Sequence, residues 1–173
     1  MFGKAGACMG LVASLEVVPA VVFKRHKDAL AELVAPPGAP TFWLDKSWLQ
    51  FHTTLRARPK PLCLAISGDH SACGRLEGGL VRAQGEEPGG DGDESEDELG
   101  DDFYLGYASP ALVQKVDQAL EKLTEETMLA AIKAAGWSLG TGGKKYYGTA
   151  FRELKKAYRA AAKQKDALQV LIT

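Results

Sequence analysis

Long hydrophobic runs are missing from this sequence. The longest, from Val17 to Phe23, is interrupted by Pro19 and followed by Lys24 and Arg25. A helix that crosses a bilayer needs about 20 consecutive apolar residues, so the sequence predicts no transmembrane segment. The opening residues MFGKAGAC also lack the apolar core of roughly 7 to 15 residues that a secretory signal requires. We therefore expect a cytoplasmic protein.

Cysteine and histidine are scarce, with three of each in 173 residues. The cysteines, Cys8, Cys63 and Cys73, are odd in number and widely spaced, which predicts reduced thiols rather than a disulfide framework. A structural zinc site needs four ligands in paired spacing, and no second pair accompanies His70 and Cys73 in the stretch DHSAC. We expect no metal and no cofactor, with His70 and Cys73 as the only candidate metal ligands.

Basic residues are absent from one stretch that is rich in acids. Between residues 86 and 102 the chain has ten carboxylates and no Lys or Arg, which leaves 12 acidic against 21 basic residues elsewhere. The glycines and carboxylates of this region cannot bury enough apolar area to offset the entropy of ordering, so we expect a mobile acidic loop at about 84–102. The acidic residues are Glu86, Glu87, Asp91, Asp93, Glu94, Glu96, Asp97, Glu98, Asp101 and Asp102.

This acidic run does not match a calcium-binding EF-hand. Asp91, Asp93 and Ser95 have suitable spacing, but Glu96 and Asp102 stand where the loop requires Gly and Glu. Ten carboxylates in seventeen residues can instead imitate a nucleic-acid backbone and occupy a basic surface. We therefore predict a non-enzymatic protein whose acidic run binds a basic protein partner, as an immunity-type inhibitor of a toxin would. Pairing of the run with basic residues of its own chain stays an alternative.

The hydrophobic pattern predicts strands separated by helices. Strands are expected at 8–18, 61–68, 103–107 and 167–173, and helices at 20–34, 44–55, 110–123, 124–136 and 149–164. Ser109 followed by Pro110 is typical of a helix start, Thr124 before two glutamates is another N-cap signal, and Asp45 is expected to cap the second helix. The pattern predicts an α/β (α+β) fold, in which a mixed sheet packs against helices in a layered single domain.

Several short motifs occur in an order that resembles one known family. They are MGLVAS from Met9, LDKSW with His52 four residues beyond its tryptophan, PLCLAISG, GDDFYLGYASP, and the final stretch that begins YGTAFRELKK. Together they resemble the YfbM-like family, small bacterial proteins defined as a domain of unknown function. The resemblance covers residues 9–173 and leaves 1–8 as an N-terminal extension. It implies a single compact α/β domain and no established activity, and the acidic run departs from the family's pattern.

Asp45, Trp48 and His52 form a candidate constellation for a ligand or for catalysis. Trp48 and His52 are four residues apart and share a helix face, whereas an N-cap Asp45 would accept bonds from backbone N–H groups. A buried structural histidine is the favoured interpretation, and His52 is the one candidate catalytic residue. The alternative is a small-ligand-binding protein or enzyme whose pocket contains Asp45, Trp48, His52 and Tyr107 beside the Gly140 loop.

The loop GTGGKK does not form a nucleotide triphosphatase signature. A P-loop needs four residues between its glycines and a Ser or Thr after its Lys, whereas here Lys145 follows Lys144 and a helix is expected before the loop. Lys144, Lys145 and Arg152 stay candidates for holding an anion near a helix N-terminus. Basic residues on the outer face of an amphipathic helix are also ordinary, and this interpretation is favoured. Nucleic-acid binding through residues 144–165 is not expected, because the acidic run would compete for that surface.

Overall fold

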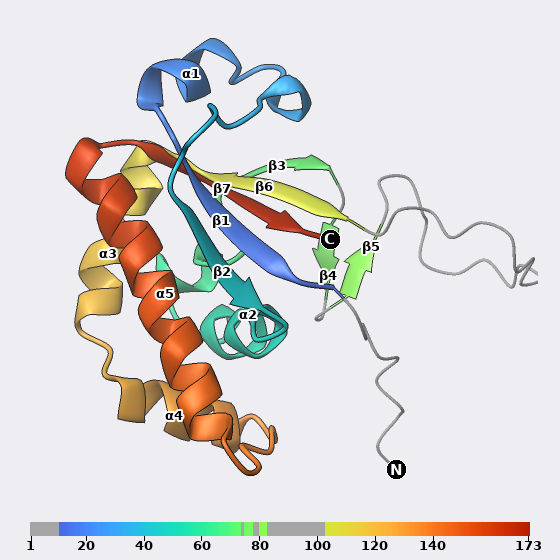
Figure 1. Ribbon diagram of the computed structural model, residues 1–173, viewed down its shortest axis with the longest axis vertical. Coiled ribbons are helices and arrows are strands. Elements are labelled where there is room, and N and C mark those ends of the chain that lie inside the picture. Colours follow the sequence, from blue (N-terminus) through green and yellow to red (C-terminus); the bar gives the residue numbers. More distant parts are fainter. Residues whose placement is uncertain (1–10, 74, 78–79, 83–102) are drawn as a thin grey trace, which may run out of the picture.

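A computed structural model of the chain describes residues 11–73, 75–77, 80–82 and 103–173. Five strands form a sheet in the order β2-β1-β7-β6-β3 (Figure 1). The α+β class is confirmed, but every pairing in this sheet is antiparallel, so the expectation of a mixed sheet is wrong. The strands are β1 (Ala13–Val18), β2 (Thr41–Asp45), β3 (His70–Cys73), β6 (Tyr104–Ala108) and β7 (Ala167–Ile172), with a separate hairpin of β4 (Arg75–Glu77) and β5 (Leu80–Arg82).

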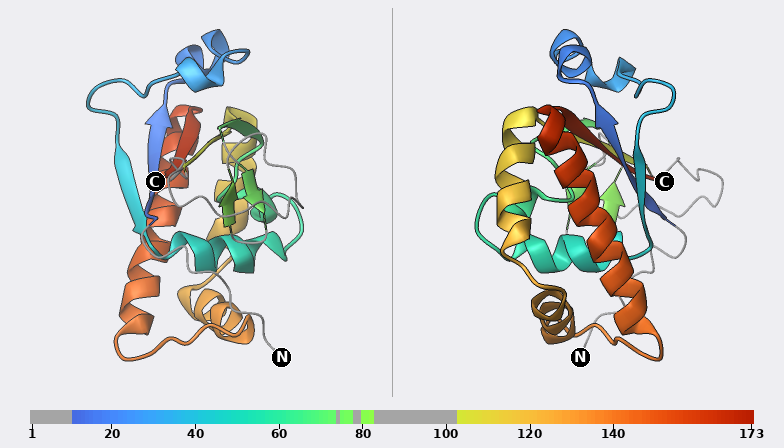
Figure 2. Two further views of the ribbon diagram at one scale, coloured as in Figure 1. Left: turned by 90° about the vertical axis from the view of Figure 1, so that its right-hand side faces the viewer. Right: turned by 60° about the vertical axis from the view of Figure 1, so that its left-hand side comes forward.

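Helices cover one face of the five-stranded sheet. α3 (Pro110–Glu121) and α5 (Gly143–Gln164) lie side by side over it and run in opposite directions, which explains why β7 returns antiparallel to β6 (Figure 2). α2 (Trp48–Arg56) and α4 (Glu125–Ala134) lie at one end of this layer, and the short α1 (Ala20–Arg25) lies at the opposite end of the molecule (Figure 1). Within the described ranges, no helix is long and apolar enough to cross a membrane.

The main core lies between the sheet and α5. Side chains alternate along the central strands, so that Leu15 of β1 and Val170 of β7 face the helices and are fully buried. They pack in the same cluster as Phe151, Leu154 and Tyr158, which recur at three- and four-residue intervals along α5 as the sequence predicts. Each such buried side chain contributes about 1.5–3 kcal/mol relative to an exposed one.

A smaller core lies on the other face of the sheet, beneath α1 and a short 3-10 helix that starts at Leu30. Tyr107 of β6 is fully buried there, and its hydroxyl lies 3.2 Å from the carbonyl oxygens of both Leu30 and Leu33. An α-helix over 20–34 would use the Leu30 carbonyl for its own ladder. In the structure the first helix ends at Arg25, and the Leu30 carbonyl oxygen accepts the 3-10 bond from the N–H of Leu33 at 3.1 Å and lies close to the Tyr107 hydroxyl.

The stretch that surrounds Asp45 differs from the single helix that we expected. TFWLD forms the edge strand β2, because Thr, Phe and Trp favour extended pairing and β1 offers a sheet edge. Helix α2 starts only at Trp48, and Ser47 occupies its N-cap position without a side-chain cap bond. The expected N-cap role of Asp45 is therefore wrong.

The run PLCLAISG is a turn rather than the expected strand. Leu62–Leu64 form a short 3-10 helix, and Ala65 and Ile66 after it are buried in the main core. A short apolar run fits a buried turn as well as a buried strand. The backbone hydrogen bonds of the run are local, from the N–H of Leu64 to the Pro61 carbonyl at 3.0 Å and from the N–H of Gly68 to the Leu64 carbonyl at 2.8 Å, so these groups close turns instead of joining a sheet.

The C-terminal half of the chain follows the expectations closely. Ser109 Oγ accepts a hydrogen bond from the N–H of Leu112 at 3.3 Å, and Thr124 Oγ1 accepts one from the N–H of Thr127 at 3.1 Å. Both expected N-caps are thus confirmed, as are the strands at β6 and β7. Helix α5 begins at Gly143, earlier than the sequence indicates.

Candidate binding site between β2 and α5

A pocket lies between the edge strand β2 and the N-terminal half of α5. Its volume is about 370 Å³, and the loop that precedes α5 supplies part of its wall. Pockets of roughly 300–1,000 Å³ are typical of sites that hold small ligands. The lining side chains that can act chemically are Trp43, Asp45, Lys145, Tyr146, Thr149 and Glu153.

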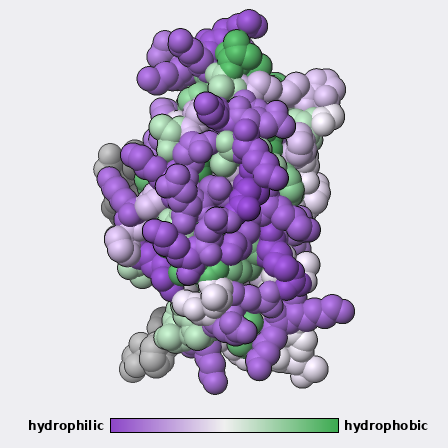
Figure 3. Space-filling model, turned by 90° about the vertical axis from the view of Figure 1, so that its left-hand side faces the viewer, coloured by the Kyte–Doolittle hydropathy of each residue, from purple (hydrophilic) through white to green (hydrophobic). Residues whose placement is uncertain are grey.

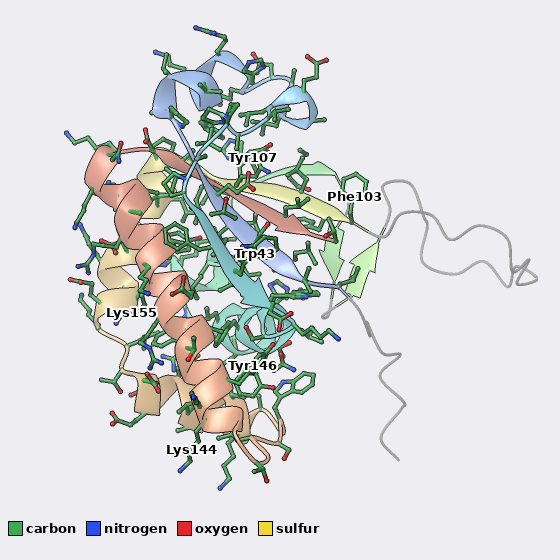
Figure 4. All side chains as sticks on the ribbon, in the orientation of Figure 1. Trp43, Phe103, Tyr107, Lys144, Tyr146 and Lys155 are labelled. Carbon is green, nitrogen blue, oxygen red and sulfur yellow. The ribbon has the colours of Figure 1, made fainter. Side chains whose placement is uncertain are left out.

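Two aromatic side chains at this pocket stay exposed to solvent. They are Trp43 of β2 and Tyr146 of α5, both labelled in Figure 4. The exposed fraction is 61% for Trp43 and 39% for Tyr146. Leu44 is fully buried in the main core, and alternation along the strand therefore directs its neighbours Trp43 and Asp45 away from the core. Large exposed apolar groups that gather at one place often mark a contact surface. The two rings make the pocket a candidate binding site.

Asp45 joins the two walls of the pocket. It ends β2 in a left-handed backbone conformation with φ of 49°, which Asp tolerates better than most residues. Its Oδ2 accepts a hydrogen bond from the Tyr146 hydroxyl at 3.0 Å. Burial, followed by the hydrogen bond and charge of Asp45, raises the pKa of Tyr146 to about 12. The phenol therefore keeps its proton at neutral pH and holds the carboxylate in place.

Charges of both signs line the pocket. Lys145 comes from the first turn of α5 and Glu153 from its middle, where Glu153 Oε1 accepts a hydrogen bond from Lys156 Nζ at 2.7 Å. Gly142 occupies the N-cap position of α5 and offers no side-chain cap, and the first turn of the helix has no acidic residue. Together with Asp45, the lining offers two carboxylates and one ammonium group beside two aromatic rings.

The three candidate anion ligands do not converge. Lys145 lines the pocket, whereas Lys144 is exposed in the first turn of α5 (Figure 4). Arg152 Nη1 forms an ion pair with Glu125 of α4, and its Nη2 donates a hydrogen bond to Thr149 Oγ1 at 3.0 Å. Arg152 is thus engaged by Glu125 and Thr149, and Lys145 alone of the three lines the pocket, so the three side chains do not gather around one anion.

Trp48 and His52 lie in the interior and do not line the pocket. Trp48 is 1% exposed, and its Nε1 donates a hydrogen bond to the Leu11 carbonyl oxygen at 3.1 Å. His52 is 4% exposed, and its Nε2 has no hydrogen-bond partner in the part of the chain that the structure describes. Burial, and then the charge of Arg56, lower the pKa of His52 to about 4, so the ring is neutral at neutral pH. This placement fits a structural histidine.

Tyr107, the remaining pocket candidate, belongs to the second core. Its hydroxyl lies 3.3 Å from Gln169 Oε1, in addition to the two carbonyl oxygens described above. These contacts connect β6 and β7 to the segment after α1. Tyr107 thus stabilises the fold at a distance from the β2–α5 pocket.

A second pocket, of about 380 Å³, lies beside the start of α3 between Lys60, Asp69, Ser109 and Lys115. Asp69 accepts hydrogen bonds from the N–H of Ser109 at 2.7 Å and from its Oγ at 2.6 Å, and His70 Nδ1 lies 3.1 Å from the same carboxylate. Burial alone would raise the pKa of Asp69, but the bonds from Ser109 and His70 outweigh it and lower the pKa. Because Ser109 also caps α3, its hydroxyl is engaged in closing the helix end rather than poised for nucleophilic attack.

The candidate metal ligands His70 and Cys73 both lie in β3. The His70 ring packs edge-on against Phe23, with 5.4 Å between the ring centroids. In the described ranges, no three His, Cys, Asp or Glu residues are grouped as a metal site would require. The ten acidic residues between 86 and 102 lie outside the described residues.

Sequence reasoning did not find Trp43, Tyr146 and Glu153 as members of one site. Trp43 carried a local signal, because the alternation in TFWLD with Leu44 buried requires the tryptophan to face outwards. The meeting of Tyr146 with Asp45 had no such signal, since 101 residues separate them. Only the packing of α5 against β2 brings these side chains together.

Comparison with known proteins places the fold and leaves the function open. No family model and no curated protein matches the sequence. Among solved structures the chain is similar to "The Crystal Structure of a Protein of Unknown Function YfbM from Escherichia coli", with a TM-score of 0.60 and 17% sequence identity. The similarity covers 94% of this chain and 99% of the YfbM chain. At this identity it shows the fold alone, and the YfbM-like fold that the sequence motifs predict is thereby confirmed.

Proposed function

We propose that the protein binds a basic polypeptide through its acidic residues. The sequence places ten carboxylates between residues 86 and 102 with no basic residue among them. A dense run of one sign of charge attracts a surface of the opposite sign and steers its approach. An immunity-type inhibitor of a toxin is one kind of protein that would work in this way.

The observation that carries this proposal is that the arginines of α5 already have carboxylate partners. Arg152 pairs with Glu125 of α4. Arg159 Nε lies 3.2 Å from Asp117 Oδ1 of α3, and its Nη2 pairs with Glu121. The outer surface of these helices is hydrophilic (Figure 3), and part of its positive charge is neutralised locally. The acidic run is therefore not required to neutralise these arginines, which favours a partner outside the molecule over pairing within it.

Neutralising the run tests the proposal. Replacing the acidic residues from 86 to 98 by Gln and Asn removes eight of the ten charges and keeps the length of the chain. In a pull-down from extracts of the native cell at stepped salt concentrations, the wild-type chain should retain a basic protein that the neutralised chain loses. Equal retention of that protein by both chains at every salt step would contradict the proposal. Urea unfolding curves of the two chains should coincide and serve as the folding control.

A second candidate function is the binding of a small ligand in the β2–α5 pocket. The specific observation in its favour is that Trp43 and Tyr146 remain exposed around one cavity. Native mass spectrometry of the protein purified from its own cell tests this candidate. A bound mass that disappears in Trp43→Ala would support it, and wild-type protein without any bound mass would count against it.

A further inference from the structure

Carboxylates outnumber cations among the residues that line the β2–α5 pocket. Asp45 and Glu153 supply two negative charges, and Lys145 supplies one positive charge. An anion that entered this pocket would lie near both carboxylates in a partly desolvated space, where repulsion between like charges is strong. A cationic guest is attracted by the two carboxylates and repelled only by Lys145.

The aromatic walls also suit a cation. A guanidinium or ammonium group within about 6 Å of a ring centre is attracted by the electron-rich face of the ring, most strongly for tryptophan. A guanidinium group is planar, stacks on aromatic rings and donates several hydrogen bonds in a fixed fork, whereas an ammonium group is compact and strongly hydrated. Trp43 is 61% exposed, so part of its indole surface is open to a guest. The combination of rings and carboxylates therefore favours arginine over lysine.

We propose that this pocket receives an arginine side chain of the basic partner, an inference that rests on the proposed function. The methylene stem packs against Trp43 and Ala150, and the guanidinium group donates hydrogen bonds to Asp45 and Glu153. Tyr146 prepares the site, because its hydroxyl fixes the Asp45 carboxylate before the guest arrives.

Glu153 is also available to such a guest. Its present partner is Lys156, three residues further along the same helix, in an ion pair whose side chains are 29% and 64% exposed. Exposed pairs of this kind contribute little to stability and exchange readily with other partners. An arginine that stacks on Trp43 can therefore share or replace the Lys156 contact. The guest thus connects both walls of the pocket, as Asp45 and Tyr146 already do.

The positive charge of Lys145 repels a cationic guest. A variant without this charge therefore tests whether the pocket prefers a cation or an anion. Removal of the Lys145 charge should strengthen the binding of a cation and weaken the binding of an anion. Lys144 supplies a matched control, because it is the preceding residue of the same helix turn and does not line the pocket. Asp45→Asn is a second sharp variant, since the amide oxygen still accepts the Tyr146 hydrogen bond while the charge is lost.

The experiment is an NMR titration of the ¹⁵N-labelled full-length protein with N-acetyl-arginine amide, followed at the indole N–H of Trp43. N-acetyl-citrulline amide, a neutral analogue of almost the same shape, is the control ligand. We expect saturation by the arginine ligand with a dissociation constant on the order of millimolar, and no saturable shift with citrulline. Asp45→Asn should weaken binding roughly tenfold, Lys145→Gln should strengthen it about twofold, and Lys144→Gln should leave it unchanged.

Three results of the titration would overturn the inference: equal binding of the two ligands, weaker arginine binding in Lys145→Gln, or tighter binding of inorganic phosphate than of arginine. The pull-down separates this failure from failure of the proposed function. If neutralising the acidic run abolishes retention of the basic protein while Trp43→Ala with the run intact retains it at every salt step, the function stands and the pocket inference falls.

Discussion

Two pairs of aromatic residues in this fold differ in where their polar atoms find partners. Trp48 and Tyr107 are buried, and both donate hydrogen bonds to backbone carbonyl oxygens. Trp43 and Tyr146 are exposed, and the Tyr146 hydroxyl donates to the side chain of Asp45. A ring that is tied to the backbone serves the stability of the fold, whereas exposed rings beside a surface carboxylate can still accept a guest. Exposure and the type of partner therefore separate the structural aromatics from the two that we propose bind a guest.

The largest expected effect separates the two tryptophans. Trp48→Ala should lower the free energy of unfolding by about 3–5 kcal/mol, because it leaves a cavity in the main core and an unpaired Leu11 carbonyl. Trp43→Ala should change it by less than about 0.5 kcal/mol, since most of this side chain is already in solvent. Urea denaturation followed by circular dichroism measures both. Similar losses of unfolding free energy in the two variants would contradict the distinction between a structural Trp48 and an exposed Trp43.

A pH-dependent effect of intermediate size is expected at His52. Its pKa is about 4 in the folded protein and about 6.5 in the unfolded chain, so the unfolded state binds more protons between these values. Stability contributed by the neutral ring is fully present above pH 6.5 and is lost as the pH falls to 4, by about 3 kcal/mol in total. His52→Gln, which cannot titrate, should lack this loss.

The measurement is the difference in unfolding free energy between wild type and His52→Gln from pH 4 to pH 7. The carboxylates titrate in both proteins, so their contributions to the pH dependence largely cancel in this difference. A difference that does not change with pH would show that His52 is accessible to protons in the folded state, and it would reopen a role for this residue in a site.

The smallest effects compare the two tyrosines. Tyr107→Phe should cost about 1–3 kcal/mol, because the single buried O–H proton that the carbonyl oxygens of Leu30 and Leu33 share is lost. Tyr146→Phe should cost less than about 1 kcal/mol, since the Asp45 carboxylate can turn to water. Thermal unfolding measures the first, and amide hydrogen exchange in the first turn of α5 detects the loosened contact in the second. If Tyr146→Phe lost more unfolding free energy than Tyr107→Phe, the Tyr146 hydroxyl would have a structural role instead.

The sequence predicted the regular parts of this fold better than its edges. Helices α3 and α4 and their N-caps can be predicted from the sequence, because Ser109 and Thr124 cap them through hydrogen bonds to residues only three positions away. The strand TFWLD is not predicted, because the helical spacing from Trp48 onwards also fits Leu44 and so extends the expected helix over the end of the strand. The turn after Pro61 was mistaken for a strand because a short buried run has no periodicity that separates the two.

The candidate site was only partly readable for a related reason. Asp45 and Lys145 were singled out from the sequence, and both line the pocket. Trp48 and His52 shared the helix face that drew attention, but that face packs into the core. Proximity along a helix can be predicted from residue spacing. The approach of β2 to α5 depends on the whole topology, including the three helices, α3, α4 and α5, that connect β6 to β7.

The most direct test of the binding account is a set of intermolecular NOEs between N-acetyl-arginine amide and the protein. The account predicts NOEs from the methylene protons of the ligand to the indole ring of Trp43 and to the ring of Tyr146. NOEs that reach only other parts of the surface, or their persistence in Trp43→Ala, would contradict it.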